Sequence, residues 1–208
     1  MVQRVAFLRA VNLGSRKAPM ATVRTVVERL GYEDVWTLAN SGNVVFDAAG
    51  SRAAIEREIG DALAAELGFE VTTFVRSVKE LRATMALRPF AVEPADTYFV
   101  TFLAQPATAK QRAALEAMSD DFDTLVVRGR DVHWLMHGRS IDTHLTSKRW
   151  ESVIGHHTST SRNTTMLEKL LAKIDALGGP SDWPGDRHPG ETRPGGNHAA
   201  NRRRHRRQ

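Results

Sequence analysis

Apolar residues along the chain fall into short runs that are typical of buried strands, and the runs are separated by turn-forming residues. In the first half, these runs predict strands over residues 5–11, 35–39, 44–46 and 71–75. In the second half, they predict strands over residues 98–103, 125–127 and 132–136. The segments 40–43 and 129–131 between neighbouring runs have the Asn, Gly and Asp content of hairpin turns.

Between the predicted strands, apolar residues recur at the three- and four-residue spacing of an amphipathic helix. Ser77 with Glu80, and Thr108 with Gln111, have the spacing of capping boxes, in which each side chain bonds the other residue's backbone N–H. These signals predict helices over residues 19–30, 51–67, 77–88, 108–118, 149–154 and 164–177.

The order strand, helix, strand, strand, helix therefore occurs twice. It resembles the split βαβ, or ferredoxin-like, arrangement. We expect an α+β protein of two ferredoxin-like subdomains packed together, over residues 1–92 and 93–177. Residue identity between the two halves is low, so the repeat rests on pattern alone.

Composition changes this picture only at the C-terminus. Residues 178–208 contain six Gly and four Pro, and their seven Arg outnumber three acidic residues. With almost no aliphatic side chains they cannot offset the entropy of ordering, so we expect a disordered tail. The remaining residues hold 22 Lys and Arg against 21 acidic residues, so the net charge of +5 belongs mainly to the tail.

Cysteine is absent, which excludes disulfides, thiolate metal sites and cysteine nucleophiles. Arg4 and Arg9 interrupt the first apolar stretch, which makes it a poor secretory signal. No uncharged apolar run reaches the roughly 20 residues of a membrane span. We therefore expect a cytoplasmic protein with no membrane partner, whose oligomeric state the sequence leaves open.

Polar residues gather at the ends of predicted strands and form three candidate site segments. Arg9, Asn12 and Gly14 follow the first strand, Ser41, Gly42 and Asn43 belong to the first hairpin turn, and Arg162 and Asn163 precede the last helix. If they share one rim, they could bind a small anionic or polar ligand. Turn geometry explains Asn12, Gly14 and the hairpin equally well, and helix capping explains Asn163.

Common catalytic motifs are missing, including the phosphate loop, G-x-G-x-x-G, H-E-x-x-H and G-x-S-x-G. His133 and His137 lie four residues apart on a strand, about 13 Å, too far for one metal ion. His156 and His157 have no nearby acidic residue in the sequence. The sequence thus indicates no metal site and no cofactor, leaves the catalytic residues unknown, and leaves enzymatic activity open.

Two other functions compete with the ligand site. A run of arginines near the C-terminus is typical of non-specific nucleic-acid binding, although no aromatic residue is interleaved for base stacking. This run comprises Arg202, Arg203, Arg204, Arg206 and Arg207. The third possibility is an interaction module with no small-molecule site.

Several segments in order resemble a bacterial family called domain of unknown function 1697 (DUF1697). They are VAFLRAVNLG, PMATVRTVVERLGYEDVWTLANSGNVVF, FVRSVKELRA, YFVTFL, VVRGRDVHWL and TSRNTTMLEKL. The resemblance covers roughly residues 3–177 and is most specific in its N-terminal block. It implies an α+β fold with ferredoxin-like subdomains and no particular activity. The motif positions of the family coincide with the three candidate site segments, so the resemblance implies that these residues matter to its members. The family pattern usually continues the Arg-Asn pair with a tryptophan and a polar residue, but Thr164 and Thr165 stand here.

Overall fold

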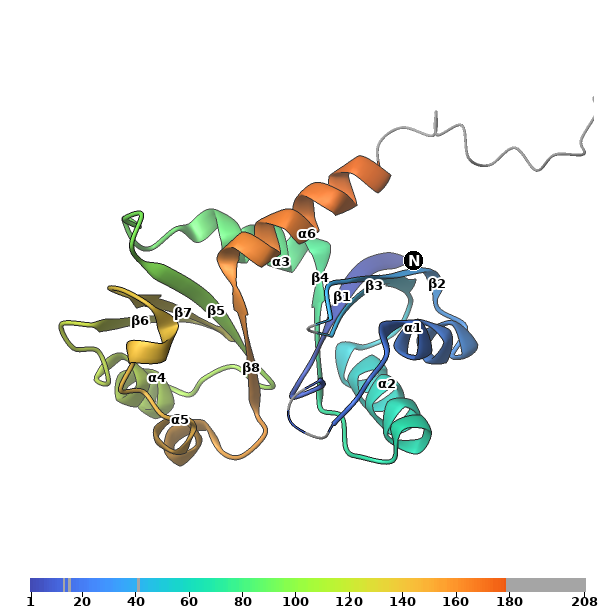
Figure 1. Cartoon of the computed structure of the whole chain (residues 1–208), viewed down its shortest axis with the longest axis horizontal. Coiled ribbons are helices and arrows are strands. Elements are labelled where there is room, and N and C mark those ends of the chain that lie inside the picture. The colour runs from blue at the N-terminus through green and yellow to red at the C-terminus, as the bar shows by residue number, and fades with distance from the viewer. Residues whose placement is uncertain (13, 15, 41, 179–208) are drawn as a thin grey trace, which may run out of the picture.

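The computed structural model of the chain describes residues 1–12, 14, 16–40 and 42–178. This part contains two four-stranded antiparallel sheets, each covered by helices (Figure 1). The N-terminal half comprises β1 (Val2–Leu8), α1 (Met20–Arg29), β2 (Glu33–Leu38), β3 (Asn43–Ala48), α2 (Arg52–Leu67), β4 (Thr73–Ser77) and α3 (Val78–Leu87). The C-terminal half comprises β5 (Thr97–Leu103), α4 (Ala109–Glu116), β6 (Asp123–Arg128), β7 (Asp131–Met136), the short 3-10 helix η1 (Ser140–Asp142), α5 (Ser147–Ile154), β8 (Ser159–Asn163) and α6 (Thr164–Leu177).

Both sheets have the ferredoxin-like strand order. The N-terminal sheet runs β2-β3-β1-β4 and the C-terminal sheet runs β6-β7-β5-β8. In each half, two βαβ units interlock, so that the first and third strands are central. The predicted α+β fold with two ferredoxin-like parts is therefore confirmed. The predicted tail, 178–208, lies outside the described residues apart from Gly178.

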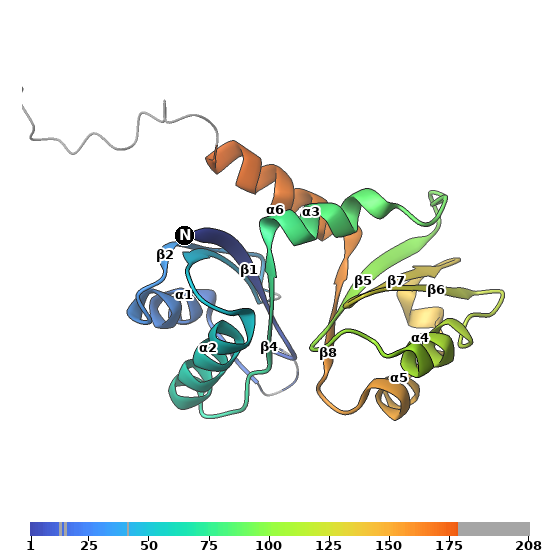
Figure 2. The same ribbon diagram turned by 180° about the vertical axis from the view of Figure 1, so that it is seen from behind.

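The layers follow from which face of each sheet is apolar. One core lies between the N-terminal sheet and α1 and α2, and another lies between the C-terminal sheet and α4 and α5. A third core joins the opposite faces of both sheets and includes apolar residues of α3 and α6. Figures 1 and 2 show α3 and α6 lying across one end of the space between the sheets. In this third core, the rings of Phe7 and Phe102 stack with their centroids 4.3 Å apart.

Local chemistry explains most element boundaries. Both predicted capping boxes are confirmed, at Ser77 with Glu80 and at Thr108 with Gln111. The first strand ends at Leu8, short of the predicted residue 11, because Ala10 and Asn12 have positive φ angles that turn the chain. The strand β8 was not predicted, since its sequence STSRN lacks an apolar pattern.

The two halves correspond residue by residue across the central strands. Val5 of β1 pairs with Arg76 of β4, and Val100 of β5 pairs with Arg162 of β8. In the same way, Phe7 pairs with Asn43, and Phe102 pairs with Asp131. The pattern-level repeat in the sequence is thus a structural repeat, and positions on the paired strands of one half have counterparts in the other.

Outside positions 13, 15 and 41, no helix up to residue 178 combines the length and apolar character needed to cross a bilayer.

Candidate functional site

A cavity of about 650 Å³ lies where the two halves meet, beside the edge strand β8. The loop after β1 forms one wall with residues 8–12, and Asn40 of the first hairpin adjoins it. The C-terminal half forms the other wall with Thr101, Trp134 and residues 159–162. Leu145, Ser147, Trp150 and Glu151, from α5 and the loop before it, complete the lining.

Arg162 joins the candidate segment before α6 to the first hairpin turn and to Leu8, directly before Arg9. Its Nε donates to Asn43 Oδ1 at 2.7 Å, and its Nη2 donates to Leu8 O at 2.8 Å and Gly42 O at 3.3 Å. Its Nη1 donates to Thr160 Oγ1 and Ser161 O. All three guanidinium nitrogen atoms of Arg162 therefore donate hydrogen bonds, which join the two halves and hold the cavity wall in place.

Burial also sets the charge of Arg162. The side chain is largely buried, and this desolvation lowers its pKa from the usual value of 12.5 to about 10. A group with that pKa stays protonated at neutral pH. The ring of Phe7, 5.5 Å from its guanidinium carbon, adds a cation–π contact.

The side-chain amide of Asn12 is hydrogen-bonded within its own loop and to the first hairpin. Its Oδ1 accepts the Ala18 N–H at 2.8 Å, and its Nδ2 donates to Ala18 O and to Asn40 O. This explains the positive φ of Asn12, because asparagine tolerates that region and can bond nearby backbone. Gly14, also at positive φ, is exposed in the same loop.

Gly42 is required by close packing at the hairpin. Its φ is +74°, and a Cβ atom there would lie 2.5 Å from Val11 Cγ2 and 2.9 Å from Leu8 Cβ. The next residue, Asn43, is fully buried and donates its Nδ2 to Leu38 O. The hairpin thus fixes the β1 loop, and Ser41 lies outside the described residues.

Arg9 is the predicted site residue with the most freedom to meet a ligand. Its Nη1 donates to Ser159 O at 2.8 Å, and its Nη2 lies 3.3 Å from Glu151 Oε1. The side chains of Arg9 and Glu151 are 27% and 21% exposed. This pair spans the cavity between the halves. The exposed His156 contacts the other oxygen of Glu151 at 2.7 Å. The expectation that no acidic residue lies near His156 is therefore wrong, because Glu151 precedes it by one turn and the loop after α5.

Two tryptophans form the apolar wall of the cavity. The ring centroids of Trp134 and Trp150 are 5.4 Å apart, with the planes tilted by 54°. The hydroxyl groups of Thr101 and Ser161, 2.7 Å apart, lie in the same lining. Trp134, Trp150 and Glu151 were not predicted as site residues. The two tryptophans have the spacing of core residues, and no local pattern distinguishes Glu151 from other acidic residues on helices.

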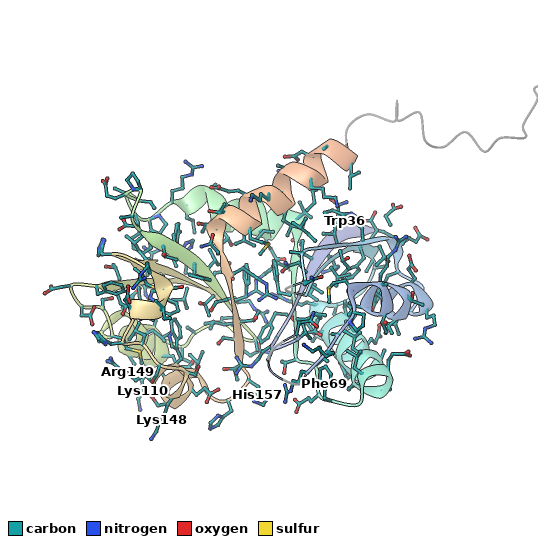
Figure 3. All side chains as sticks on the ribbon, viewed as in Figure 1. Trp36, Phe69, Lys110, Lys148, Arg149 and His157 are labelled. Carbon is teal, nitrogen blue, oxygen red and sulfur yellow. The ribbon has the colours of Figure 1, made fainter. Side chains whose placement is uncertain are left out.

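Positive charge lies beside the cavity residue Ser147. Lys148 and Arg149 are exposed in the first turn of α5, next to the cavity residue Ser147. Figure 3 shows them with Lys110 at the edge of the molecule formed by α4 and α5. The positive end of the α5 dipole adds to these charges.

Asn163 lies outside the cavity lining. Its Oδ1 accepts the Thr165 N–H at 2.9 Å, so it caps α6 as the sequence indicated. The arginines Arg202, Arg203, Arg204, Arg206 and Arg207 lie outside the described residues.

The histidines of the second half do not meet at the cavity. His133 is buried and its Nδ1 is hydrogen-bonded to the Tyr98 hydroxyl, 2.5 Å away. His137 lies 3.3 Å from Asp96 at the surface. In the part of the chain that the structure describes, no three His, Asp or Glu side chains are grouped as a metal site would require.

The chain is therefore an α+β protein of two ferredoxin-like halves, with a candidate ligand site where they meet. The chain belongs to the family described as "Protein of unknown function (DUF1697)", whose pattern residues 1–133 match. The resemblance noted in the sequence is therefore confirmed.

The structure is also similar to that of the conserved bacterial protein SP0830 from Streptococcus pneumoniae. The TM-score is 0.62 at 18% sequence identity, over 84% of this chain and 99% of that chain. This likeness shows the fold alone. No curated protein matches the chain.

Proposed function

We propose that this protein binds a small anionic or polar ligand in the cavity between its two halves. The observation that carries the proposal is the cavity's lining. It places the Arg9–Glu151 pair, two indole rings and several hydroxyl groups around about 650 Å³ of space. Small-molecule sites have this composition, with apolar and aromatic walls and a few convergent polar groups.

The other half of the molecule supports the proposal by contrast. Ser147 is the first residue of α5, and its counterpart at the start of α2 is Arg52. Gly42 precedes Asn43, and its counterpart before Asp131 is Arg130. Ser147 lines the cavity, and Gly42 lies against Leu8 and Val11 of its wall. Both are therefore small where their counterparts are arginines.

Arg130 lies close enough to Arg52 and to Arg76, the counterpart of Arg162, for their charges to act on it. Arg52 Nη1 and Arg130 Nε are buried, and Arg130 Nη2 donates to Ala104 O. Burial, together with the charges of Arg52 and Arg76, lowers the pKa of Arg130. The corresponding place therefore holds long arginine side chains, where the cavity has the small residue Ser147 in its lining.

A substitution that copies the filled half tests the proposal. Ser147→Arg should occupy the cavity, and Ser152→Arg makes the same change at an exposed position of the same helix. A panel of nucleotides, sugar phosphates, hydroxy acids and amino acids is screened by thermal shift. A ligand at one hundred times its Kd should stabilise the wild type by about 2.7 kcal/mol, raising Tm by roughly 5–10 °C.

The expected result is a shift that persists in Ser152→Arg and disappears in Ser147→Arg. The proposal is wrong if no compound stabilises the wild type. It is also wrong if Ser147→Arg, shown to be folded by circular dichroism, keeps the full shift.

A further inference from the structure

The indole N–H of Trp150 is buried without an acceptor among the described residues, although its ring lines the cavity. The residue is 7% exposed, and its Nε1 atom is buried and unpartnered. A buried indole N–H usually finds an acceptor, because leaving it unpaired destabilises the fold. This one therefore calls for an explanation.

The neighbouring tryptophan shows what the same group does when the fold supplies its partner. Trp134 Nε1 donates to Asp123 Oδ1 at 2.7 Å, and Asp123 also accepts from the Thr143 hydroxyl. The two indoles share one cavity wall, but only Trp134 has its donor satisfied. The N–H of Trp150 has no described acceptor, and an oxygen atom of a bound molecule would supply one.

Arg9 offers further donors on the same cavity. A guanidinium has five N–H groups. Among the described residues, Arg9 Nη1 has Ser159 O as its acceptor, and Arg9 Nη2 has Glu151 Oε1. The Glu151 contact is long, at 3.3 Å, and its geometry is not the paired fork that binds a carboxylate most tightly. An incoming oxyanion could take the guanidinium from Glu151, which would keep its contact with His156.

The remaining lining includes apolar side chains from both halves. Leu8 and Val11 come from the N-terminal half, and Leu145 and the two indoles come from the C-terminal half. A ligand that uses both kinds of lining carries an oxyanion and an apolar body. A flat ring suits the indole faces.

We propose that the cavity takes a small ring-bearing oxyanion, a carboxylate or a phosphate monoester. Its charged group meets Arg9, and one of its oxygen atoms accepts the Trp150 N–H. This inference rests on the proposed function of the cavity and names its ligand class.

Four probes separate the parts of the ligand. Benzoate and phenyl phosphate carry both ring and charge, benzyl alcohol has the ring without the charge, and inorganic phosphate has the charge without the ring. Titration calorimetry should find binding by benzoate, phenyl phosphate or both, at least tenfold tighter than by the two partial probes. Which one binds more tightly decides between carboxylate and phosphate. Benzyl alcohol binding as tightly as both charged probes would overturn the inference.

Nuclear magnetic resonance of the indole N–H groups tests the Trp150 contact directly. Trp150→Phe assigns its signal, which should move downfield and exchange more slowly with water when the bound probe is added. Trp150→Phe should weaken binding about tenfold, and Trp134→Phe less than about threefold, because the Trp134 N–H is held by Asp123. An unmoved Trp150 signal in the presence of a bound probe would overturn the contact.

The outcome also separates this inference from the function that it builds on. If a neutral compound binds the wild type and is excluded by Ser147→Arg while both charged probes fail, the cavity is a ligand site and only the ligand class is wrong. If nothing that binds is excluded by Ser147→Arg, both are wrong.

Discussion

At the scale of single residues, His133 shows how burial controls charge. It is fully buried opposite Val100, with Tyr98 hydrogen-bonded to Nδ1 and no described partner for Nε2. Burial lowers the pKa of His133, and Arg128 lowers it further, while Asp131 acts in the opposite direction. Burial also raises the pKa of Tyr98 to about 12. Both groups are therefore neutral in the folded protein at pH 7.

This burial makes stability depend on pH. Between the lowered native pKa of His133 and the unfolded value of about 6.5, the unfolded chain binds the extra proton, so stability rises with pH. The free energy of unfolding should fall as pH drops below about 6.5, by at most about 1.4 kcal/mol per pH unit. Urea unfolding between pH 5 and 7.5 measures it, and His133→Leu should have the smaller slope. Equal slopes in both proteins would contradict the prediction.

At the scale of elements, a helix N-cap at the last residue of the edge strand joins strand to helix in both halves. Ser77 ends β4 and caps α3, and its counterpart Asn163 ends β8 and caps α6. A capping side chain satisfies one of the free N–H groups in the first helical turn. Each helix can therefore begin directly at the end of the strand and cover the space between the sheets.

The capping role of Asn163 predicts an effect on stability alone. Asn163→Ala should lower the free energy of unfolding by about 1 kcal/mol, as Ser77→Ala should at the corresponding place. Because Asn163 lies outside the cavity lining, ligand affinity should stay within twofold of the wild type. Chemical denaturation and calorimetry measure the two quantities. A large loss of affinity with little loss of stability would instead make Asn163 a ligand contact.

At the scale of the whole molecule, buried arginines of the edge strands join the two halves. Arg76 crosses to the C-terminal half, where it bonds Asp131 at 2.9 Å and donates to Leu103 O. Arg162 crosses in the opposite direction to Leu8 and Asn43. Together with the core that the sheets share, these contacts favour unfolding of both halves in one transition. The predicted boundary after residue 92 stays a prediction.

Removing one of these arginines should be costly. Arg76→Leu leaves Asp131 buried without its cation and should destabilise the protein by about 3–5 kcal/mol. The double variant Arg76→Leu/Asp131→Leu should recover most of this loss, because no charge is then left unpaired. Arg24→Leu, which breaks an exposed pair with Glu28, should cost under about 0.5 kcal/mol. Thermal unfolding compares the three variants, and a small effect of Arg76→Leu alone would contradict the account.

The sequence by itself determined the class of fold and most element boundaries. Strand and helix periodicity, the capping boxes at Ser77 and Thr108, and the turn residues before Asn43 all act between near neighbours. Local signals of this kind can be read without knowing the tertiary structure. The missing strand, β8, shows their limit, because an edge strand of Ser, Thr, Arg and Asn has no apolar pattern to reveal it.

Only the tertiary structure decided which candidate site residues remain available to a ligand. Arg9, Asn12 and Arg162 look alike as polar residues at strand ends, but Asn12 and Arg162 direct their hydrogen bonds to the fold. The cavity also needs Trp150 and Glu151, which lie more than 130 residues from Arg9 in the sequence. The physical reason is that a donor's availability depends on which distant acceptors packing brings within 3 Å, and no local pattern encodes that.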